Sequence, residues 1–197
     1  MSVKFKKITS VLLLVTVALS TKLMAQEKTG ENKTTFSIET DPSTFLFKGY
    51  ALHFRIKPKN SKHAVIGAGA YALEMPAFLV NLTGANKNKG WNVRINSAFS
   101  FFGEYYFNEA NNNWFAGLQA GVQNYKNTND NIPNTENNYS NLLVMPSIGY
   151  NWHPLKNGLY VKPWLGLGYT TKISGDNSTY KIAPVTSFVT VHVGYTF

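Results

Sequence analysis

The chain has 197 residues, a formal net charge of +9, 14% aromatic residues and no cysteine. This length is sufficient for one domain with a full core. The absence of cysteine excludes a small secreted disulfide scaffold and a lipoprotein anchored through its N-terminal cysteine.

The first 25 residues have the pattern of a secretory signal peptide. Three lysines among the first seven residues precede an apolar stretch over 8–19, and Ala25 stands before a polar residue. A basic start, a short apolar stretch and a small residue at the end are typical of such peptides. The stretch is shorter than the roughly 20 residues of a spanning helix, which disfavours an uncleaved anchor. We therefore expect cleavage after Ala25 and a short flexible lead over 26–33. The mature net charge would be +5, because four lysines and no acid are removed.

From about residue 34 onward, apolar and polar residues alternate with a period of two, the pattern of β-strands with two different faces. We prefer eight strands to the seven that one bent strand over 34–58 would give, because an even number returns both termini to the same side. The expected strands cover 34–40, 49–58, 63–73, 91–107, 113–126, 142–153, 159–170 and 185–197.

The longest segment, 91–107, shows how the faces are assigned. Its alternation places a mainly apolar set on one face: Val93, Ile95, Phe99, Phe101, Tyr105 and Phe107. The opposite, more polar set is Asn92, Arg94, Asn96, Ser100 and Glu104. Strands that meet lipid on one side only have this composition. A soluble barrel of lipocalin type would show the same alternation with its apolar faces turned inward around a ligand, so alternation alone leaves both interpretations open.

The connections and the aromatic residues favour the membrane. Short connections at 59–62, 108–112 and 154–158 alternate with long ones at 74–90, 127–140 and 173–182. Outer-membrane barrels have short periplasmic turns and longer extracellular loops, whereas a β-sandwich has no reason to alternate in this way. Aromatic residues of the proposed lipid face cluster beside the short turns and the C-terminus, as a girdle would. They are Phe107, Trp114, Trp152, Tyr195 and Phe197. The predicted fold class is therefore all-β: a closed, antiparallel, up-and-down transmembrane β-barrel of eight strands formed by residues 34–197.

The last residues carry a family resemblance. They alternate between apolar and polar positions, with an aromatic residue third from the end and a terminal phenylalanine: Val191, Val193, Tyr195 and Phe197. This ending resembles the C-terminal assembly signal of outer-membrane barrels, which implies recognition by the barrel-assembly machinery. With the strand count, the chain resembles the small barrels of the OmpA/OmpX type and the outer-membrane β-barrel proteins of Bacteroidota. The resemblance implies an outer-membrane location, with membrane lipid around the barrel and both termini in the periplasm. We also expect a monomer. Loop and rim lysines either meet lipopolysaccharide phosphates or are simply solvated: Lys48, Lys87, Lys89, Lys126, Lys172 and Lys181.

Charged residues on the inward faces form a candidate site. An eight-stranded barrel is just wide enough for its own side chains to fill it, and an isolated buried charge is costly. We therefore expect Glu39 or Glu104 to pair with at least one of Arg55, Arg94 and Lys162. The expected lumen charge network is Glu39, His53, Arg55, Arg94, Glu104 and Lys162, with His192 also turned inward. Such a network either holds the wall together, which we favour, or forms an ion gate or proton path.

Two connections are too apolar for solvated loops. Residues 73–82 and 45–47 are expected to fold together over the outer mouth, with a short helix near 76–82. The expected outer-mouth cluster is Phe45, Phe47, Phe78 and Leu79. It either closes the barrel by packing on itself, which we favour, or holds a small apolar ligand.

The motifs do not indicate catalysis. No His-Glu-x-x-His sequence and no Gly-x-Ser-x-Gly elbow occurs, so we expect neither a metal site nor a catalytic serine. The basic residues form no aromatic-interleaved patch for nucleic acid, and no cofactor is expected. The sequence thus predicts a non-catalytic barrel with a structural or surface-interaction role. One alternative is a conduit for small apolar molecules through a lateral opening, or a binder for them at the outer mouth. Another is a barrel enzyme that modifies lipid A as an acylase or deacylase.

Overall fold

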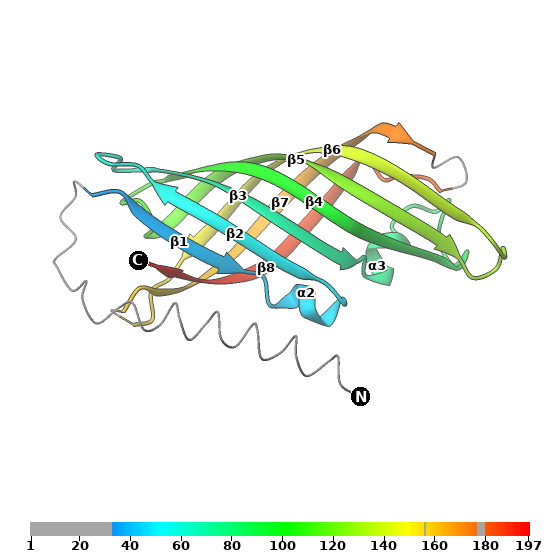
Figure 1. The fold of residues 1–197 in the computed structure, drawn as a ribbon, viewed down its shortest axis with the longest axis horizontal. Helices are drawn as coiled ribbons and strands as arrows, with labels where there is room; N and C mark the ends of the chain where they lie inside the picture. The colour runs from blue at the N-terminus through cyan, green and yellow to red at the C-terminus, as the bar shows by residue number, and fades with distance from the viewer. Residues whose placement is uncertain (1–32, 156, 177–179) are drawn as a thin grey trace, which may run out of the picture. The chain divides into compact units, whose positions relative to one another are not determined.

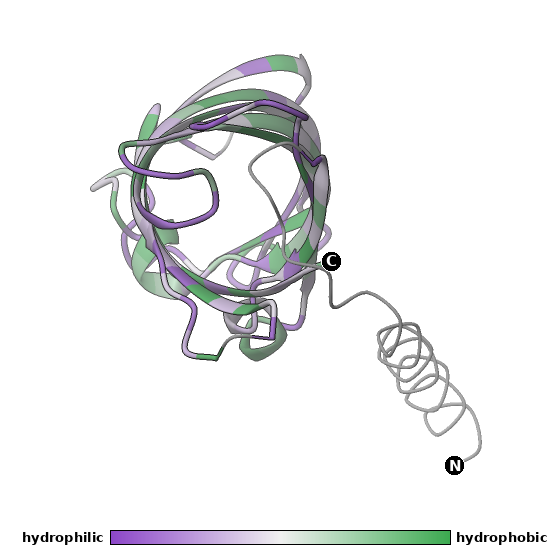
Figure 2. Cartoon of the chain, turned by 90° about the vertical axis from the view of Figure 1, so that its left-hand side faces the viewer, coloured by the Kyte–Doolittle hydropathy of each residue, from purple (hydrophilic) through white to green (hydrophobic). Residues whose placement is uncertain are grey.

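Eight antiparallel strands close into one barrel, in which each strand pairs with its neighbours in the chain and β1 pairs with β8 (Figures 1 and 2). The computed structural model describes residues 33–155, 157–176 and 180–197. The expected signal peptide and nearly all of the expected lead lie outside this part. The elements are β1 (Thr35–Thr40), α2 (Ser43–Leu46), β2 (Tyr50–Lys57), β3 (Ala64–Glu74), α3 (Ala77–Val80), β4 (Trp91–Tyr106), β5 (Asn113–Asn129), β6 (Glu136–Asn151), β7 (Leu159–Gly175) and β8 (Val185–Thr196). The predicted eight strands are confirmed.

The barrel is apolar outside and charged inside. Leu165 and Leu167 on β7 and Val189 on β8 are exposed on the outer face, whereas Arg55 and Lys162 are buried in the interior. The lipocalin interpretation is excluded, because it requires the apolar faces to point inward.

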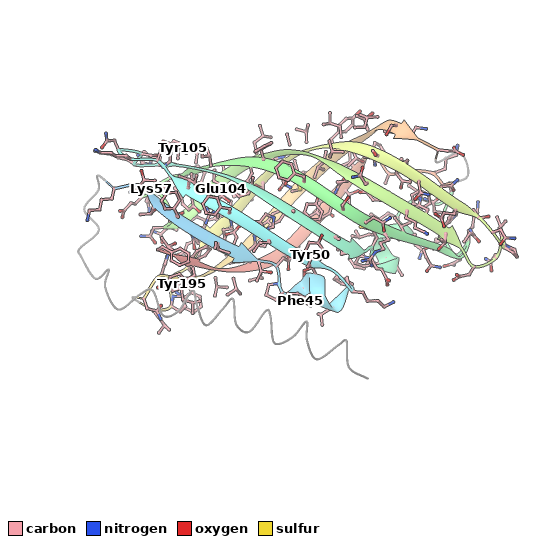
Figure 3. The ribbon with its side chains drawn as sticks, viewed as in Figure 1. Phe45, Tyr50, Lys57, Glu104, Tyr105 and Tyr195 are labelled. Atoms are coloured by element: carbon pink, nitrogen blue, oxygen red, sulfur yellow. The ribbon has the colours of Figure 1, made fainter. Side chains whose placement is uncertain are left out.

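Aromatic side chains surround the end of the barrel where the short connections lie. Trp114, Trp152 and Phe107 are each more than half exposed there, and Tyr105 and Tyr195 project outward at the same end (Figure 3). Amphipathic rings at one depth are typical of the boundary between hydrocarbon and water.

The face assignment of β4 changes within the strand. Ile95 pairs with Tyr125 and Ser97 with Asn124, so β4 holds one more residue than β5 at this point. Such a β-bulge shifts the alternation by one residue and moves every following side chain to the other face. The prediction that Val93 and Ile95 share a face with Phe99 is therefore wrong: both are buried inside, whereas Phe99 is exposed outside.

The predicted 127–140 loop is mostly strand. β5 continues to Asn129 and β6 begins at Glu136, so only 130–135 connect them. Cross-strand contacts explain the extension. The rings of Tyr125 and Tyr139 stack with centroids 5.0 Å apart, and Lys126 lies 2.7 Å from Glu136. The β5–β6 hairpin therefore projects beyond its neighbours (Figure 1).

Within the described residues, every helix is too short or too polar to cross a membrane.

Replacing Leu165 by Arg tests whether the outer face meets lipid. Leu165 lies midway along the exposed apolar face of β7. An arginine at the midplane of a barrel costs about 2–4 kcal/mol, but only about 0–1 kcal/mol near the interface. We expect Leu165→Arg to lose stability in this range and Thr171→Arg, near the end of β7 that leads to β8, to lose much less. Urea unfolding in lipid vesicles measures both, and equal losses would contradict the transmembrane orientation.

Candidate functional site

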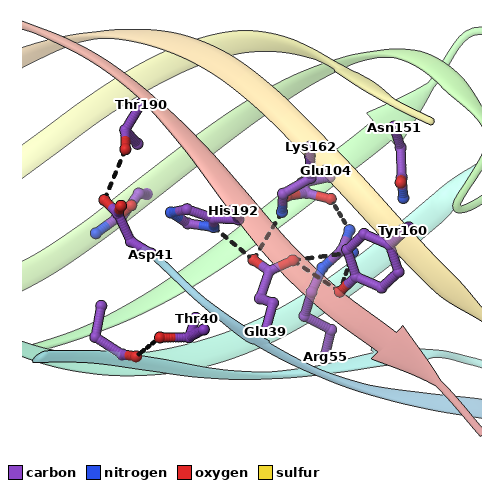
Figure 4. A network of polar contacts seen from close by, with 12 residues as sticks. Glu39, Thr40, Asp41, Arg55, Glu104, Asn151, Tyr160, Lys162, Thr190 and His192 are labelled. Carbon is purple, nitrogen blue, oxygen red and sulfur yellow. Dashed lines mark hydrogen bonds and ion pairs between the residues drawn. The ribbon is translucent and has the colours of Figure 1, made fainter. Parts of the chain in front are cut away.

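Two acids and two bases meet inside the barrel. Glu39, Arg55, Glu104 and Lys162 come from β1, β2, β4 and β7, and alternation turns all four inward. The Lys162 Nζ atom lies 2.8 Å from Glu39 Oε1 and 2.9 Å from Glu104 Oε1. The Arg55 guanidinium also contacts both carboxylates (Figure 4). Each cation therefore bridges both acids.

Neutral polar groups complete the hydrogen bonding of these charges. Tyr160 Oη donates to Glu39 Oε2 at 2.8 Å, and Tyr106 Oη donates to Glu104 Oε2 at 2.9 Å. Arg55 donates to both tyrosine oxygens, at 3.2 Å and 2.7 Å. His192 Nδ1 lies 2.9 Å from Glu39 Oε1. Because a buried charge needs both an opposite charge and hydrogen-bond partners, this arrangement is what makes four charges tolerable in the lumen.

The network closes the lumen at its own depth. It links β1, β2, β4, β7 and β8 across the barrel. The space left beside it is about 30 Å³, on the order of the volume of one water molecule. Among the described residues, the network and its neighbours therefore fill most of the lumen at this level.

Arg94 does not belong to the network. The β4 bulge turns it outward, where Arg94 Nη1 lies 3.6 Å from Glu74 Oε1 and donates to the Lys48 carbonyl oxygen at 3.3 Å. Lys48 itself lies 2.8 Å from Glu74. The prediction for Arg94 is therefore wrong, because the alternation that placed it inward does not continue through the bulge.

The two histidines at the network lie against each other. The rings of His53 and His192 stack with centroids 4.8 Å apart. Ligand atoms of Glu39, His53 and His192 lie within 4.8 Å of one another, which is a possible metal arrangement that sequence spacing does not reveal. The Glu39 carboxylate is already bonded to Lys162, Tyr160 and His192. Because the fixed cations would repel another cation, we assign no metal to this cluster.

An apolar cavity of about 330 Å³ lies on the side of the network toward α2 and α3. His53, Trp164 and His192 line both this cavity and the small space beside the network. The apolar walls come from several strands and both helices: Phe47, Leu73, Met75, Phe78, Leu79, Ile95, Leu143, Met145 and Phe188.

The expected outer-mouth cluster is only partly brought together. Phe47, Phe78 and Leu79 line the cavity, and α3 lies within the predicted 76–82 helix. Phe45, on α2, is exposed and does not line it (Figure 3). A four-residue helix presents neighbouring side chains in different directions, which separates Phe45 from Phe47.

The strand residues that form most of the cavity were not identified from the sequence. The sequence does carry an indication of these residues. The run Leu142-Leu143-Val144-Met145 is apolar at the inward as well as the outward positions of the strand. Such a run indicates a strand segment with apolar surroundings on both faces. Leu143 and Met145 are indeed buried inside, whereas Leu142 and Val144 face outward.

A second apolar cluster joins α3 to the β7–β8 connection. Val80, Val93 and Tyr180 are buried together, and the Trp91 ring meets the edge of Tyr180 at 5.5 Å. The Asn86 side-chain amide donates to the Lys181 carbonyl oxygen at 2.6 Å and accepts from the Lys181 N–H at 3.1 Å. Burial raises the pKa of Tyr180. These contacts hold α3, which contributes to the lining of the cavity, against the β7–β8 connection.

These observations define the class of the protein. An eight-stranded closed barrel with an apolar exterior and a charged, filled lumen is the architecture of small outer-membrane β-barrels. The chain is a barrel of this class, as the OmpA/OmpX-type resemblance implied.

The chain was also compared with known proteins. No protein-family model matches the chain, and no curated protein matches it. The N-terminal β-barrel domain of Pseudomonas aeruginosa OprF is 11% identical, with 85% of this chain and 99% of that chain covered and a TM-score of 0.42. A major outer membrane protein from Thermus thermophilus is 12% identical, with 84% of this chain and 100% of that chain covered and a TM-score of 0.49. Neisserial surface protein A is 11% identical, with 83% of this chain and 95% of that chain covered and a TM-score of 0.39.

Removing one charge of the network should destabilise the barrel strongly. Lys162→Met leaves Glu39 and Glu104 with Arg55 as their shared cation, and breaking a buried ion pair costs about 3–5 kcal/mol. Lys126→Met is the matched control, because Lys126 also pairs with a glutamate but on the exposed hairpin. Exposed pairs contribute little, so the control should unfold almost as the wild type does. Urea unfolding in vesicles measures both, and similar losses would contradict the structural role of the network.

Proposed function

We propose that the protein is a non-catalytic outer-membrane barrel that binds a small apolar molecule in the cavity above the charged network. The observation that carries this proposal is the cavity itself. Its volume of about 330 Å³ falls within the roughly 300–1,000 Å³ of small-molecule sites. Its accessible walls are mainly apolar, with polar groups that include Asp41, Gln119 and Thr190, and apolar cavities accept apolar ligands.

We place the cavity toward the cell exterior and both termini in the periplasm. The end of the barrel that holds the C-terminus also has the short connections and the exposed tryptophans. Short turns are periplasmic in outer-membrane barrels. The opposite end, with α2, α3 and the β5–β6 hairpin, would then face outward.

Retention fits this geometry better than passage into the periplasm. Arg55 and Lys162, each paired with both acids, lie between the cavity and the periplasmic end. Moving an apolar molecule past them would require separating buried ion pairs, which is costly. The lipid A-modifying alternative has less support, because no serine hydroxyl within the described ranges is hydrogen-bonded to a histidine that could activate it.

A surface interaction is a second candidate function, favoured by the β5–β6 hairpin. The hairpin is held rigidly by Tyr125–Tyr139 stacking and by the Asn127 amide, which donates to Tyr139 Oη at 3.2 Å. A projecting, ordered hairpin with polar side chains offers a contact surface for another molecule. Shortening this hairpin would test that role without touching the cavity.

Filling the cavity should abolish binding. Met145 faces the cavity from β6, and the adjacent Val144 faces outward, so Met145→Trp and Val144→Trp add the same side chain on opposite faces. We expect Met145→Trp to weaken retention of the apolar dye N-phenylnaphthylamine about tenfold or more, a change of about 1.4 kcal/mol, and Val144→Trp to leave it unchanged.

The measurement is dye retained per barrel after gel filtration in amphipol. Phe78→Asp, which places a carboxylate at the cavity wall, should also lower retention because an unpaired charge disfavours an apolar site. Equal retention by the wild type, Met145→Trp and Phe78→Asp would remove the ligand-binding proposal.

A further inference from the structure

The wall of the barrel is incomplete beside the cavity. β8 pairs with β7 from Val185 to Tyr195, but with β1 only from Val193 to Thr196. β1 ends at Thr40, and the chain then turns away into α2. Residues 185–192 of β8 therefore have no strand partner on the β1 side within the described part of the chain.

The cavity extends around this free edge. Phe188 and Thr190 lie on the inner face of β8, whereas Ser187 and Val189 lie on the outer face, because side chains alternate along a strand. All four line the cavity, although Val189 is 80% exposed. A cavity whose lining includes residues from both faces of a strand reaches the edge of that strand. The cavity therefore lies beside the gap in the wall.

The gap lies at the depth of the membrane hydrocarbon. Val189 pairs with Leu165, which lies between Val161 and Tyr169 on the outward face of β7. On the other side of the gap, Leu46 of α2 is 82% exposed. Backbone groups in hydrocarbon normally have partners within the sheet, and an unpaired edge is costly there. An occupant with an apolar body and a polar group would suit both the cavity and this edge.

Three polar side chains join the two sides of the gap at its inner corner. Thr190 Oγ1 donates to Asp41 Oδ2 at 2.8 Å, and Ser43 Oγ donates to Asp41 Oδ1 at 2.6 Å. The Ser43 and Thr190 hydroxyl oxygens lie 3.2 Å apart. These bonds hold the beginning of α2 against β8. We call Asp41, Ser43 and Thr190 the clasp.

We propose that the cavity is loaded sideways from the membrane, through the gap between β8 and α2, by a single-chain amphiphile of the fatty-acid type. One absent strand leaves about 10 Å between the flanking backbones, a width that suits one hydrocarbon chain better than a lipid with several chains. The polar head would meet the unpaired N–H and C=O groups of residues 185–192, and the clasp holds the gap closed. This inference rests on the proposed binding function and adds its ligand class and route.

A disulfide across the gap tests the route. The chain has no cysteine. The Ser43 and Thr190 side-chain oxygens lie 3.2 Å apart, so cysteine sulfurs at these positions need only a small shift to reach the S–S bond length of about 2.0 Å. The variant Ser43→Cys/Thr190→Cys, placed in phospholipid vesicles containing labelled palmitate, should load at least tenfold more slowly when oxidised than when reduced, because a locked gate blocks entry. The matched control is Asn124→Cys/Ser140→Cys, a cross-strand pair with side chains 2.7 Å apart on the exposed hairpin, which should load equally in both states.

The outcomes separate this inference from the proposed function. Palmitate retained by the reduced barrel, with slow loading only in the oxidised clasp variant, supports the lateral route. Fast loading of the oxidised barrel overturns the route and leaves cavity binding intact. Absence of any bound palmitate or dye in the wild type overturns the binding function itself. Retention of labelled diacyl phospholipid in preference to palmitate overturns the single-chain assignment.

A second variant keeps the test independent of disulfide formation. Asp41→Ala removes the acceptor that holds Ser43 and Thr190, so it should load palmitate faster than the wild type. The shift in gel mobility between heated and unheated samples checks that each variant folds. Folded Asp41→Ala with unchanged loading would contradict the role of the clasp.

Discussion

The structure depends on one constraint: within hydrocarbon, every backbone N–H and C=O must find a partner in the protein. A sheet meets this requirement only by closing on itself, which the pairing of β1 with β8 achieves. Closure in turn gives each strand two different surroundings. Residues that face lipid must be apolar, and residues that face the narrow lumen must fill it and satisfy one another.

The charged network follows from that second requirement. Glu39, Arg55, Glu104 and Lys162 are inward positions on four strands, and each cation reaches both acids. The filled lumen at the level of the network separates the cavity from the end of the barrel that holds the C-terminus. The gap beside β8 is the local exception to closure, and it lies where the cavity needs an entrance. The constraint and its exception together account for both the stability of the wall and the proposed binding site.

Much of the fold and part of the site were predictable from sequence, since both depend on a period of two. The strand number, the outward aromatic residues and the inward position of Glu39, Arg55, Glu104 and Lys162 follow from alternation. The predicted inward position of Arg94 is wrong because the bulge near Asn96 shifts the alternation of inward and outward residues by one position. The sequence around Asn96 does not indicate this bulge. The extra length of β5 and β6 was missed because asparagine-rich segments are typical of loops, and only cross-strand partners such as Lys126 and Glu136 make them strands.

The sequence by itself determined the barrel class, because alternation records which solvent each face of a strand meets, and that information is local. Only the tertiary structure decided which inward side chains touch. His53 and His192 are 139 positions apart in the chain yet stack in the lumen. The cavity and the free edge of β8 likewise depend on where β1 ends relative to β8, a property of strand register that no single segment contains.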